Sequence, residues 1–279
     1  MEIVPGVHSL RVDFQVTPAV KRYVYCYLIT GKFCYLIDSG VAGCEGMVAQ
    51  YLQGIGRDVS ELRGLFLTHA HPDHIGGGGA LRRLSGCKVY ASAGERPCIE
   101  DVALQYQARP IPNFSALVQE GVPVDQVLAD GDRVALEPGL TMEVVASPGH
   151  SVDGLTFRLA ERGVVFTGDA IPAPEDIPIY VNKQASLETL DRLASLEAER
   201  FCPAWDHAYD RPEARQVITA GKRMILRIDQ AVQRWEPSCA NLEALVDKVS
   251  ADLHRDSLGG NPLFRTTVAC HCTAPWACR

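Results

Sequence analysis

The chain of 279 residues is 47% hydrophobic and 22% charged, so it is long enough to bury one large core or two fused ones. A net charge of −7 argues against binding nucleic acid through its phosphates, and no apolar stretch approaches the roughly 18 residues of a membrane span. Ten cysteines, mostly in apolar context, and first residues that show no signal peptide favour a cytoplasmic protein with reduced, buried thiols.

Residues 6–38 are predicted to form a meander of strands. Segments rich in β-branched and aromatic residues are expected to form strands over 7–12, 23–29 and 33–37. The third of these segments ends at Asp38, which places a carboxylate at the end of an apolar strand. The simplest role for Asp38 is to cap the helix that we expect over residues 45–54.

The next apolar run ends at a polar cluster, T-H-A-H-P-D-H, which spans Thr68–His74 and is followed by four glycines two residues later. This pattern predicts a buried strand that delivers side chains at its carboxyl end. On an extended segment His69 and His71 point the same way, whereas Asp73 and His74 follow a proline that bends the chain. Because each unpaired buried polar group costs roughly 1–3 kcal/mol, we expect the cluster to bind metal.

The T-H-A-H-P-D-H segment resembles the H-x-H-x-D-H signature of the metallo-β-lactamase-fold hydrolases. The resemblance implies an α/β protein, a four-layer αββα sandwich over residues 1–210, with a helical C-terminal extension over 211–279 packed on it. It also implies that the acidic residue Asp38, together with Thr68, supports the metal ligands without binding the metal itself.

The stretch from residue 101 to 125 fits no regular element, because Pro110 and Pro112 break any helix. Long irregular segments in compact domains are often binding loops. The stretch is therefore either a surface connection or a substrate lid, and Tyr106 and Phe114 are its candidate substrate contacts.

Further candidate ligands follow the strands expected downstream, over residues 133–136, 140–145, 155–159 and 164–166. A Pro-Gly turn delivers His150 after the second of these strands, and a glycine precedes Asp169 after the fourth. The two segments resemble the P-G-H and G-D motifs of the same family, in the expected order. His207 follows another short strand, although without the glycine that usually accompanies the last histidine of the family.

The resemblance implies metal ligands in two sets joined by a shared carboxylate: His69, His71 and His150 for one ion, Asp73, His74 and His207 for the other, and Asp169 between them. Imidazole and carboxylate donors suit two Zn²⁺ ions, with iron or manganese as alternatives. In such enzymes a hydroxide shared by the metals attacks a carbonyl or phosphoryl centre, and Asp73 would orient it.

A small-molecule ester, thioester or lactone is the expected substrate. Asp169 stands where the main subclass of β-lactamases has a cysteine, which disfavours antibiotic hydrolysis. The alternatives are a phosphodiesterase and an iron-dependent oxidoreductase similar to the persulfide dioxygenases. Tyr180, Lys183 and Trp205 are further candidate substrate contacts, although a solvated lysine and a core tryptophan are the more common fates of such residues.

The C-terminal part predicts two amphipathic helices, over residues 213–235 and 241–253, with Asn241 as a cap. We expect these helices to pack on the sandwich or to form the face of a homodimer. The tail, with Cys270, His271, Cys272 and Cys278, does not have the spacing of a standard zinc site, so a thiol cluster is expected there.

Overall fold

The computed structural model describes residues 1–17, 20–173 and 175–273, which form two compact units. The first unit comprises Met1–Ala146, Asp153–Gly168 and Ala198–Tyr209, and the second comprises Ser147–Val152, Asp169–Glu197 and Asp210–Arg279. The sequence predicts a boundary at residue 210, and two internal stretches also belong to the second unit. The packing of the extension on the sandwich stays a prediction.

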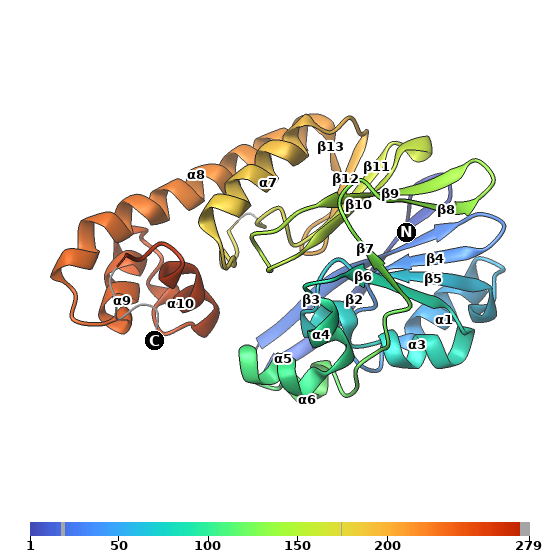
Figure 1. Cartoon of the computed structure of the whole chain (residues 1–279), viewed down its shortest axis with the longest axis horizontal. Helices are drawn as coiled ribbons and strands as arrows, with labels where there is room; N and C mark the ends of the chain where they lie inside the picture. Colours follow the sequence, from blue (N-terminus) through green and yellow to red (C-terminus); the bar gives the residue numbers. More distant parts are fainter. Residues whose placement is uncertain (18–19, 174, 274–279) are drawn as a thin grey trace. The chain divides into compact units, whose positions relative to one another are not determined.

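The first sheet has seven strands in the order β1-β2-β3-β4-β5-β6-β7 (Figure 1). The strands are β1 (Glu2–Val4), β2 (Val7–Thr17), β3 (Val20–Thr30), β4 (Cys34–Ile37), β5 (Leu62–Phe66), β6 (Lys88–Ser92) and β7 (Gln126–Leu128). Strands β1 to β4 are antiparallel, whereas β4 to β7 run parallel. Because the parallel strands end at one edge of the sheet, polar residues that follow them can meet there.

The second sheet has six strands in the order β13-β12-β11-β10-β9-β8. Its strands are β8 (Arg133–Glu137), β9 (Leu140–Ala146), β10 (Leu155–Leu159), β11 (Val164–Gly168), β12 (Arg200–Pro203) and β13 (Tyr209–Asp210). Strands β8 to β11 are antiparallel, and β12 pairs with β11 in parallel.

Apolar side chains of the two sheets pack together in one buried cluster. The ring centroids of Tyr27 and Phe166 lie 5.4 Å apart, and those of Phe66 and Phe157 also lie 5.4 Å apart. Strand β3 contributes to both faces of its sheet, because Ile29 belongs to this cluster while the adjacent Leu28 belongs to a second one. The second cluster packs the other face of the first sheet against helices.

The helices of the first unit are α1 (Glu45–Gly54), α2 (Pro72–Ile75), α3 (Gly78–Ser85), α4 (Arg96–Glu100), α5 (Val102–Ala108) and α6 (Phe114–Leu117). The expectation that residues 101–125 form no regular element is wrong. The side chain of Asp101 accepts hydrogen bonds from the first turn of α5, and Pro110 and Pro112 lie between α5 and α6. The prolines therefore separate two short helices.

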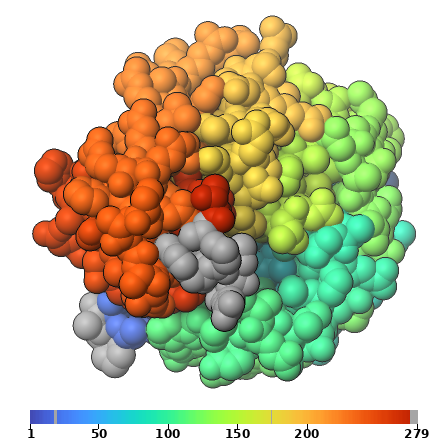
Figure 2. Space-filling model, turned by 60° about the vertical axis from the view of Figure 1, so that its left-hand side comes forward, coloured from blue at the N-terminus to red at the C-terminus, as the bar shows by residue number. Residues whose placement is uncertain are grey.

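The second unit contains α7 (Lys183–Ser195), α8 (Arg211–Trp235), α9 (Leu242–Asp252) and α10 (Pro262–Ala269), and Figure 2 shows α8 to α10 in orange and red. Asn241 caps α9 through the N–H of Ala244, as the sequence predicts. Short 3-10 helices span Val59–Glu61 and Ala160–Arg162 in the first unit, and Glu236–Ser238 and Asp256–Leu258 in the second. Within the described ranges, every helix is too short or too polar to cross a bilayer.

Candidate metal centre

The T-H-A-H-P-D-H segment leaves β5 and enters α2, whose first residue is Pro72. Nε2 of His69 lies 2.8 Å from Nδ1 of His71. The ring of His74, on α2, lies 4.1 Å from the ring of His69 between centroids. Oδ2 of Asp73 lies 3.6 Å from Nε2 of His74. The bend at the proline thus brings the helical part of the segment beside the extended part.

Asp38 lies at the end of β4 and is buried. Its carboxylate accepts hydrogen bonds from the backbone N–H and the hydroxyl of Thr68, both at 2.8 Å. Nδ1 of His74 lies 2.8 Å from the same carboxylate. The residue that precedes α1 is Cys44, without a side-chain cap, so the interpretation of Asp38 as a helix cap is wrong.

Glu95 is a buried carboxylate that sequence reasoning missed. It accepts hydrogen bonds from the N–H of Ala70, which lies between two of the candidate ligands, and from the N–H of Asp153, both at 3.0 Å. Asp153 in turn accepts one from the N–H of Gly94 at 2.7 Å. An acidic residue shortly after an apolar strand was the available signal, as it was for Asp38.

His150 follows β9 in the Pro-Gly turn, and its ring nitrogen Nδ1 lies 2.8 Å from the carbonyl oxygen of Ile179. Because a carbonyl only accepts, Nδ1 carries the proton, and this assignment leaves Nε2 with its lone pair. Nε2 lies 3.2 Å from Oδ2 of Asp169, which follows β11.

Gly168, the last residue of β11, has a left-handed backbone with φ of 51°. A Cβ at this position would lie 2.6 Å from the hydroxyl oxygen of Thr68. Only glycine therefore fits between the end of β11 and the residue that supports the histidine segment.

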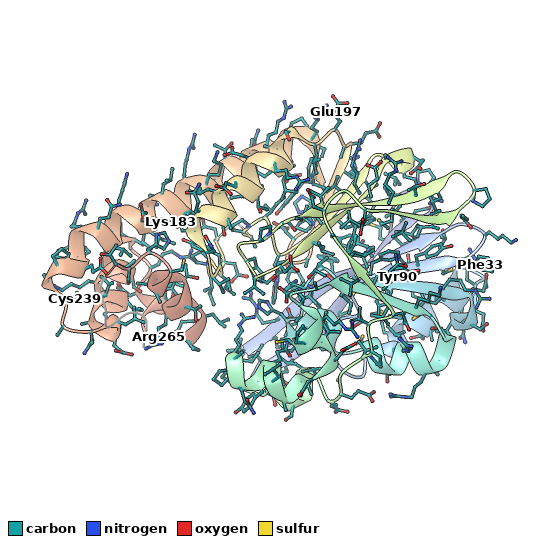
Figure 3. The ribbon with its side chains drawn as sticks, viewed as in Figure 1. Phe33, Tyr90, Lys183, Glu197, Cys239 and Arg265 are labelled. Atoms are coloured by element: carbon teal, nitrogen blue, oxygen red, sulfur yellow. The ribbon has the colours of Figure 1, made fainter. Side chains whose placement is uncertain are left out.

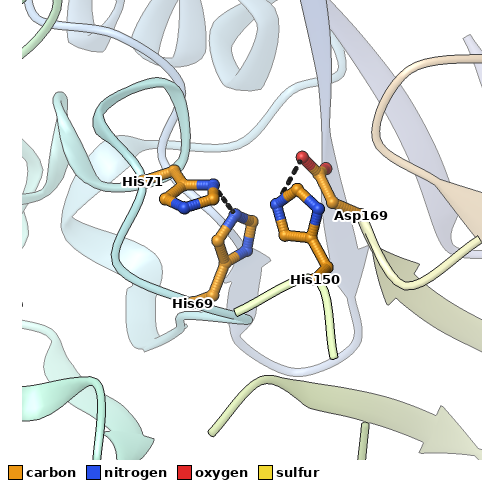
Figure 4. A group of neighbouring side chains, drawn as sticks. All are labelled: His69, His71, His150 and Asp169. Atoms are coloured by element: carbon orange, nitrogen blue, oxygen red, sulfur yellow. Dashed lines mark hydrogen bonds and ion pairs between the residues drawn. The ribbon is translucent and has the colours of Figure 1, made fainter. Parts of the chain in front are cut away.

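His69, His71, His150 and Asp169 form one group, in which one ligand atom of each residue lies within 4.8 Å of those of the others (Figure 4). Two of these side chains are buried and two are half-buried. Imidazole nitrogens with a carboxylate oxygen are donors that zinc, iron and manganese accept. Burying this many polar groups side by side would be costly without a shared partner. The residues present therefore fit a metal ion.

His207 lies outside this group of four. Its Nδ1 lies 2.8 Å from Oδ1 of Asp206, and its side chain is 60% exposed. Oδ2 of Asp206 accepts a hydrogen bond from the hydroxyl of Tyr209 at 2.9 Å. Burial opposes ionisation of Asp206, but its hydrogen bonds with the backbone and ring of His207 and with Tyr209 lower the pKa of the carboxyl.

Three of the candidate substrate contacts make aromatic contacts of their own in the first unit. The ring of Tyr106, on α5, lies 5.1 Å from that of Phe114 on α6, and Tyr106 is 49% exposed. The indole of Trp205 lies 6.5 Å from the ring of Tyr23, and the guanidinium carbon of Arg22 lies 4.5 Å from the indole centroid. Their role towards a substrate stays a prediction.

The other two candidate contacts are engaged within the second unit. Lys183, labelled in Figure 3, begins α7, and its ammonium lies 2.6 Å from Asp229 on α8. Tyr180 is 1% exposed, and its hydroxyl lies 2.9 Å from Nε2 of His271. Burial raises the pKa of Tyr180 well above its ordinary value. Tyr180 is therefore a packed residue in this structure rather than an exposed one.

Cys272 and His271 have separate partners. The thiol of Cys272 donates to the carbonyl of Val268 at 3.3 Å, and Nδ1 of His271 lies 2.9 Å from Asp229. Among the described residues this tail joins no group of metal-binding side chains. Cys278, which the sequence places in the same thiol cluster, lies outside the described residues.

Comparison with protein families gives a match over residues 19–205 to the family model described as the metallo-beta-lactamase superfamily. A hydroxyacylglutathione hydrolase of Cereibacter sphaeroides is 30% identical over 199 residues, which cover 68% of each protein. A beta-lactamase-like protein 2 homolog of Caenorhabditis elegans is 25% identical over 260 residues, or 86% of this chain and 81% of that protein.

A metallo-beta-lactamase family protein from Thermus thermophilus has a similar structure. The TM-score is 0.73 at 22% sequence identity, and the likeness covers 97% of this chain and 93% of that one. At this identity the similarity shows the fold alone. The fold class predicted from the sequence, two sheets with helices and a C-terminal helical region, is confirmed.

Proposed function

The chain belongs to the metallo-β-lactamase superfamily, and on that premise we propose that it is a metal-dependent hydrolase of a small-molecule ester, thioester or lactone. The hydroxyacylglutathione hydrolases among its relatives favour a thioester substrate, because glutathione that is acylated on its sulfur is a thioester.

One feature of the histidines carries the proposal. In four of them Nδ1 lies against an oxygen atom: His69 and the Thr68 hydroxyl at 3.0 Å, His74 and Asp38 at 2.8 Å, His150 and the Ile179 carbonyl at 2.8 Å, and His207 and Asp206 at 2.8 Å. A carboxylate or carbonyl accepts the Nδ1 proton, which leaves Nε2 as a metal donor. Such oxygen partners are typical of metal-binding imidazoles.

The Thr68 hydroxyl fits the same pattern. It donates its single proton to Asp38, so it accepts the Nδ1 proton of His69 with its lone pair. Asp38 thereby holds His74 directly and His69 through Thr68. One buried carboxylate fixes the ring orientation of two candidate ligands.

Two Zn²⁺ ions would be held by the seven donors in the sets that the family pattern implies: His69, His71 and His150; Asp73, His74 and His207; and Asp169 shared between them. Iron or manganese would accept the same donors. When bound, such a centre supplies Lewis acidity, which acidifies water and stabilises negative charge that develops on oxygen.

Asp73 is the candidate catalytic residue. Its carboxylate is mostly buried, at 13% exposure, and Oδ2 faces Nε2 of His74. In the proposed reaction this carboxylate holds the proton of the attacking water and sets the direction of its lone pair.

The test is a panel of thioesters, lactones and phosphodiesters, assayed with zinc-loaded and iron-loaded protein. We expect the zinc form to hydrolyse a thioester, ester or lactone, and Asp169→Ala to reduce that activity by more than about 100-fold. Asp132→Asn, in a turn of the first unit where the carboxylate accepts the N–H of Ala129, is the control. Full activity of Asp169→Ala, or oxygen consumption by the iron form without hydrolysis, would contradict the proposal.

A further inference from the structure

A single peptide group, between Ile179 and Tyr180, is held at both of its ends. Its carbonyl oxygen accepts the hydrogen bond from Nδ1 of His150 at 2.8 Å. Its N–H donates to the hydroxyl oxygen of Thr267 at 3.2 Å. Because a trans peptide is planar, with the C=O and N–H pointing in opposite directions, fixing the N–H also fixes the direction of the carbonyl.

Thr267 lies on α10, is completely buried and holds the neighbouring peptide group as well. Its hydroxyl donates to the carbonyl of Pro178 at 2.8 Å, while the carbonyls of Tyr180 and Leu263 both lie 3.4 Å away. A hydroxyl has one proton and two lone pairs, so donation to Pro178 leaves it free to accept from Tyr180. One side chain thus fixes both peptide groups that flank Ile179.

The turn that carries His150 is also attached to this part of the chain. The carbonyl of Gly149 accepts hydrogen bonds from the N–H of Val181 at 2.7 Å and of Asn182 at 3.2 Å. The hydroxyl of Thr189 donates to the carbonyl of Pro148 at 2.7 Å. The backbone of the turn is therefore held in place, and the remaining freedom of His150 is rotation of its ring.

A chain of side chains, of which Tyr180 and His271 are buried, supports the same peptide from the Tyr180 side. The hydroxyl of Tyr180 lies 2.9 Å from Nε2 of His271, and Nδ1 of His271 lies 2.9 Å from Asp229. Lys183 neutralises Asp229 at 2.6 Å. This network anchors Tyr180 to α8 and to the residues after α10, so the helices fix the position of the peptide while Thr267 fixes its orientation.

We propose that Thr267 is a positioning residue for the metal ligand His150, acting through the Ile179–Tyr180 peptide. The inference rests on the proposed function, because ring orientation matters only if His150 binds metal. Donation to Thr267 also polarises the peptide and makes its carbonyl a better acceptor for the Nδ1 proton. Through this residue the C-terminal helices contribute to the metal centre without supplying a ligand.

The test compares Thr267→Val, Thr267→Ser and Thr266→Val as full-length proteins. Valine has the shape of threonine without the hydroxyl, whereas serine keeps the hydroxyl. Thr266 is the matched control, because it is an exposed residue on the same helix whose hydroxyl donates to the carbonyl of Pro262, within the helix itself. Binding of Co²⁺ is measured by competition with a chelator, together with the absorption spectrum of the bound Co²⁺ and the melting temperature of the metal-free protein.

We expect Thr267→Val to weaken Co²⁺ binding by about threefold to tenfold, less than the 10–100-fold typical of a residue that contacts a ligand directly. The absorption spectrum should shift in the same variant, because the geometry of one nitrogen donor changes. Thr267→Ser and Thr266→Val should keep wild-type affinity and spectrum. If the Thr267→Val protein does not fold, Thr267→Ala takes its place, because alanine also lacks the hydroxyl and introduces no atom that threonine does not have.

A purely structural role for Thr267 would lower the melting temperature of Thr267→Val and leave its Co²⁺ affinity and spectrum unchanged, which would overturn the inference. Equal loss of affinity in Thr267→Ser would also overturn it, because packing rather than the hydroxyl would then be responsible. In both cases the wild-type protein still binds Co²⁺, so the proposed function stands. If the wild-type protein itself binds no Co²⁺, the proposed function fails and the inference fails with it.

Discussion

Asp38 and His74 form a hydrogen-bonded pair with 2.8 Å between Oδ2 and Nδ1, and their side chains are only 3% and 0% exposed. A buried carboxylate is costly unless donors surround it. Here the backbone N–H and hydroxyl of Thr68 supply two further hydrogen bonds. The end of β4, the segment after β5 and helix α2 are therefore joined at one carboxylate.

Replacing Asp38 with asparagine should weaken metal binding. The amide offers one acceptor oxygen and turns its NH₂ towards a donor, either His74 or Thr68. We expect an affinity for Zn²⁺ lower by about 10–100-fold and a loss of roughly 1–3 kcal/mol in the free energy of unfolding. Chelator competition and urea denaturation measure the two effects. Wild-type Zn²⁺ affinity in a folded Asp38→Asn protein would contradict the supporting role.

Glu95→Gln should loosen the segment between His69 and His71. Separate oxygens of Glu95 accept the N–H groups of Ala70 and Asp153, so one of these donors must face the NH₂ of glutamine. We expect a destabilisation of about 1–3 kcal/mol in urea denaturation, accompanied by weaker Zn²⁺ binding.

Glu100→Gln is the control for Glu95→Gln. At Glu100 a single oxygen accepts from both Val124 and Arg96, and the amide oxygen of glutamine can replace it. This variant should lose little stability and keep its affinity for Zn²⁺. Equal losses in the two variants would show that Glu95 has no special relation to the histidine segment.

Gly168→Ala should destabilise the protein more than Gly139→Ala. Both glycines have left-handed backbones, with φ of 51° and 77°, so each substitution carries a conformational cost of about 1–2 kcal/mol. A Cβ at Gly168 would also meet the Thr68 hydroxyl at 2.6 Å, whereas no atom of the described residues lies within 4 Å of one at Gly139. The additional crowding should cost about 1–3 kcal/mol in thermal or urea unfolding. Equal stability of the two variants would be inconsistent with this contact.

The stability of the metal-free protein should depend on His271 at mildly acidic pH. Burial lowers the pKa of His271, and the hydrogen bond to Asp229 offsets this only in part. A lowered pKa in the folded state stabilises the fold above the unfolded pKa of about 6.5, and this contribution is lost as pH falls below that value.

The measurement is the urea midpoint from about pH 7 to about pH 5, where wild type should lose stability more steeply than His271→Asn. His254→Asn is the control, because His254 is exposed and has a left-handed φ of 56° that asparagine tolerates. In the control the urea midpoint should fall with pH as steeply as in wild type. If the midpoint of His271→Asn fell equally steeply, His271 would not be the source of the pH dependence.

The sequence predicts the elements that are periodic and bounded by turn residues. The strand over 155–159 and the helix over 45–54 lie where expected, and Asn241 caps its helix. The pattern does not predict strand β7, and it does not give bounds for helix α10 within the expected helical extension. β7 has only three residues and is defined by its pairing with β6, a contact between segments far apart in the chain. Short elements of this kind carry too little pattern to be recognised alone.

The candidate ligands are predicted because each follows an apolar strand within a short motif, and the structure brings four of them together: His69, His71, His150 and Asp169. The family resemblance also predicts Asp38 and Thr68 as supporting residues, whereas the sequence predicts no such role for Glu95 or Thr267. Glu95 is separated from Ala70 by 25 positions and from Asp153 by 58, and Thr267 from Tyr180 by 87. Glu95 follows strand β6 by three positions, but this signal alone does not identify its hydrogen-bond partners, and Thr267 has no local pattern that distinguishes it from any helical threonine. Their role depends on tertiary hydrogen bonds.

The most direct test of the metal centre is elemental analysis of the purified wild-type protein and of His150→Ala and Asp169→Ala. We expect two zinc ions per wild-type chain and fewer in each variant, because both residues belong to the group that includes His69 and His71. A wild-type protein that retains no metal, or variants that retain as much as wild type, would contradict it.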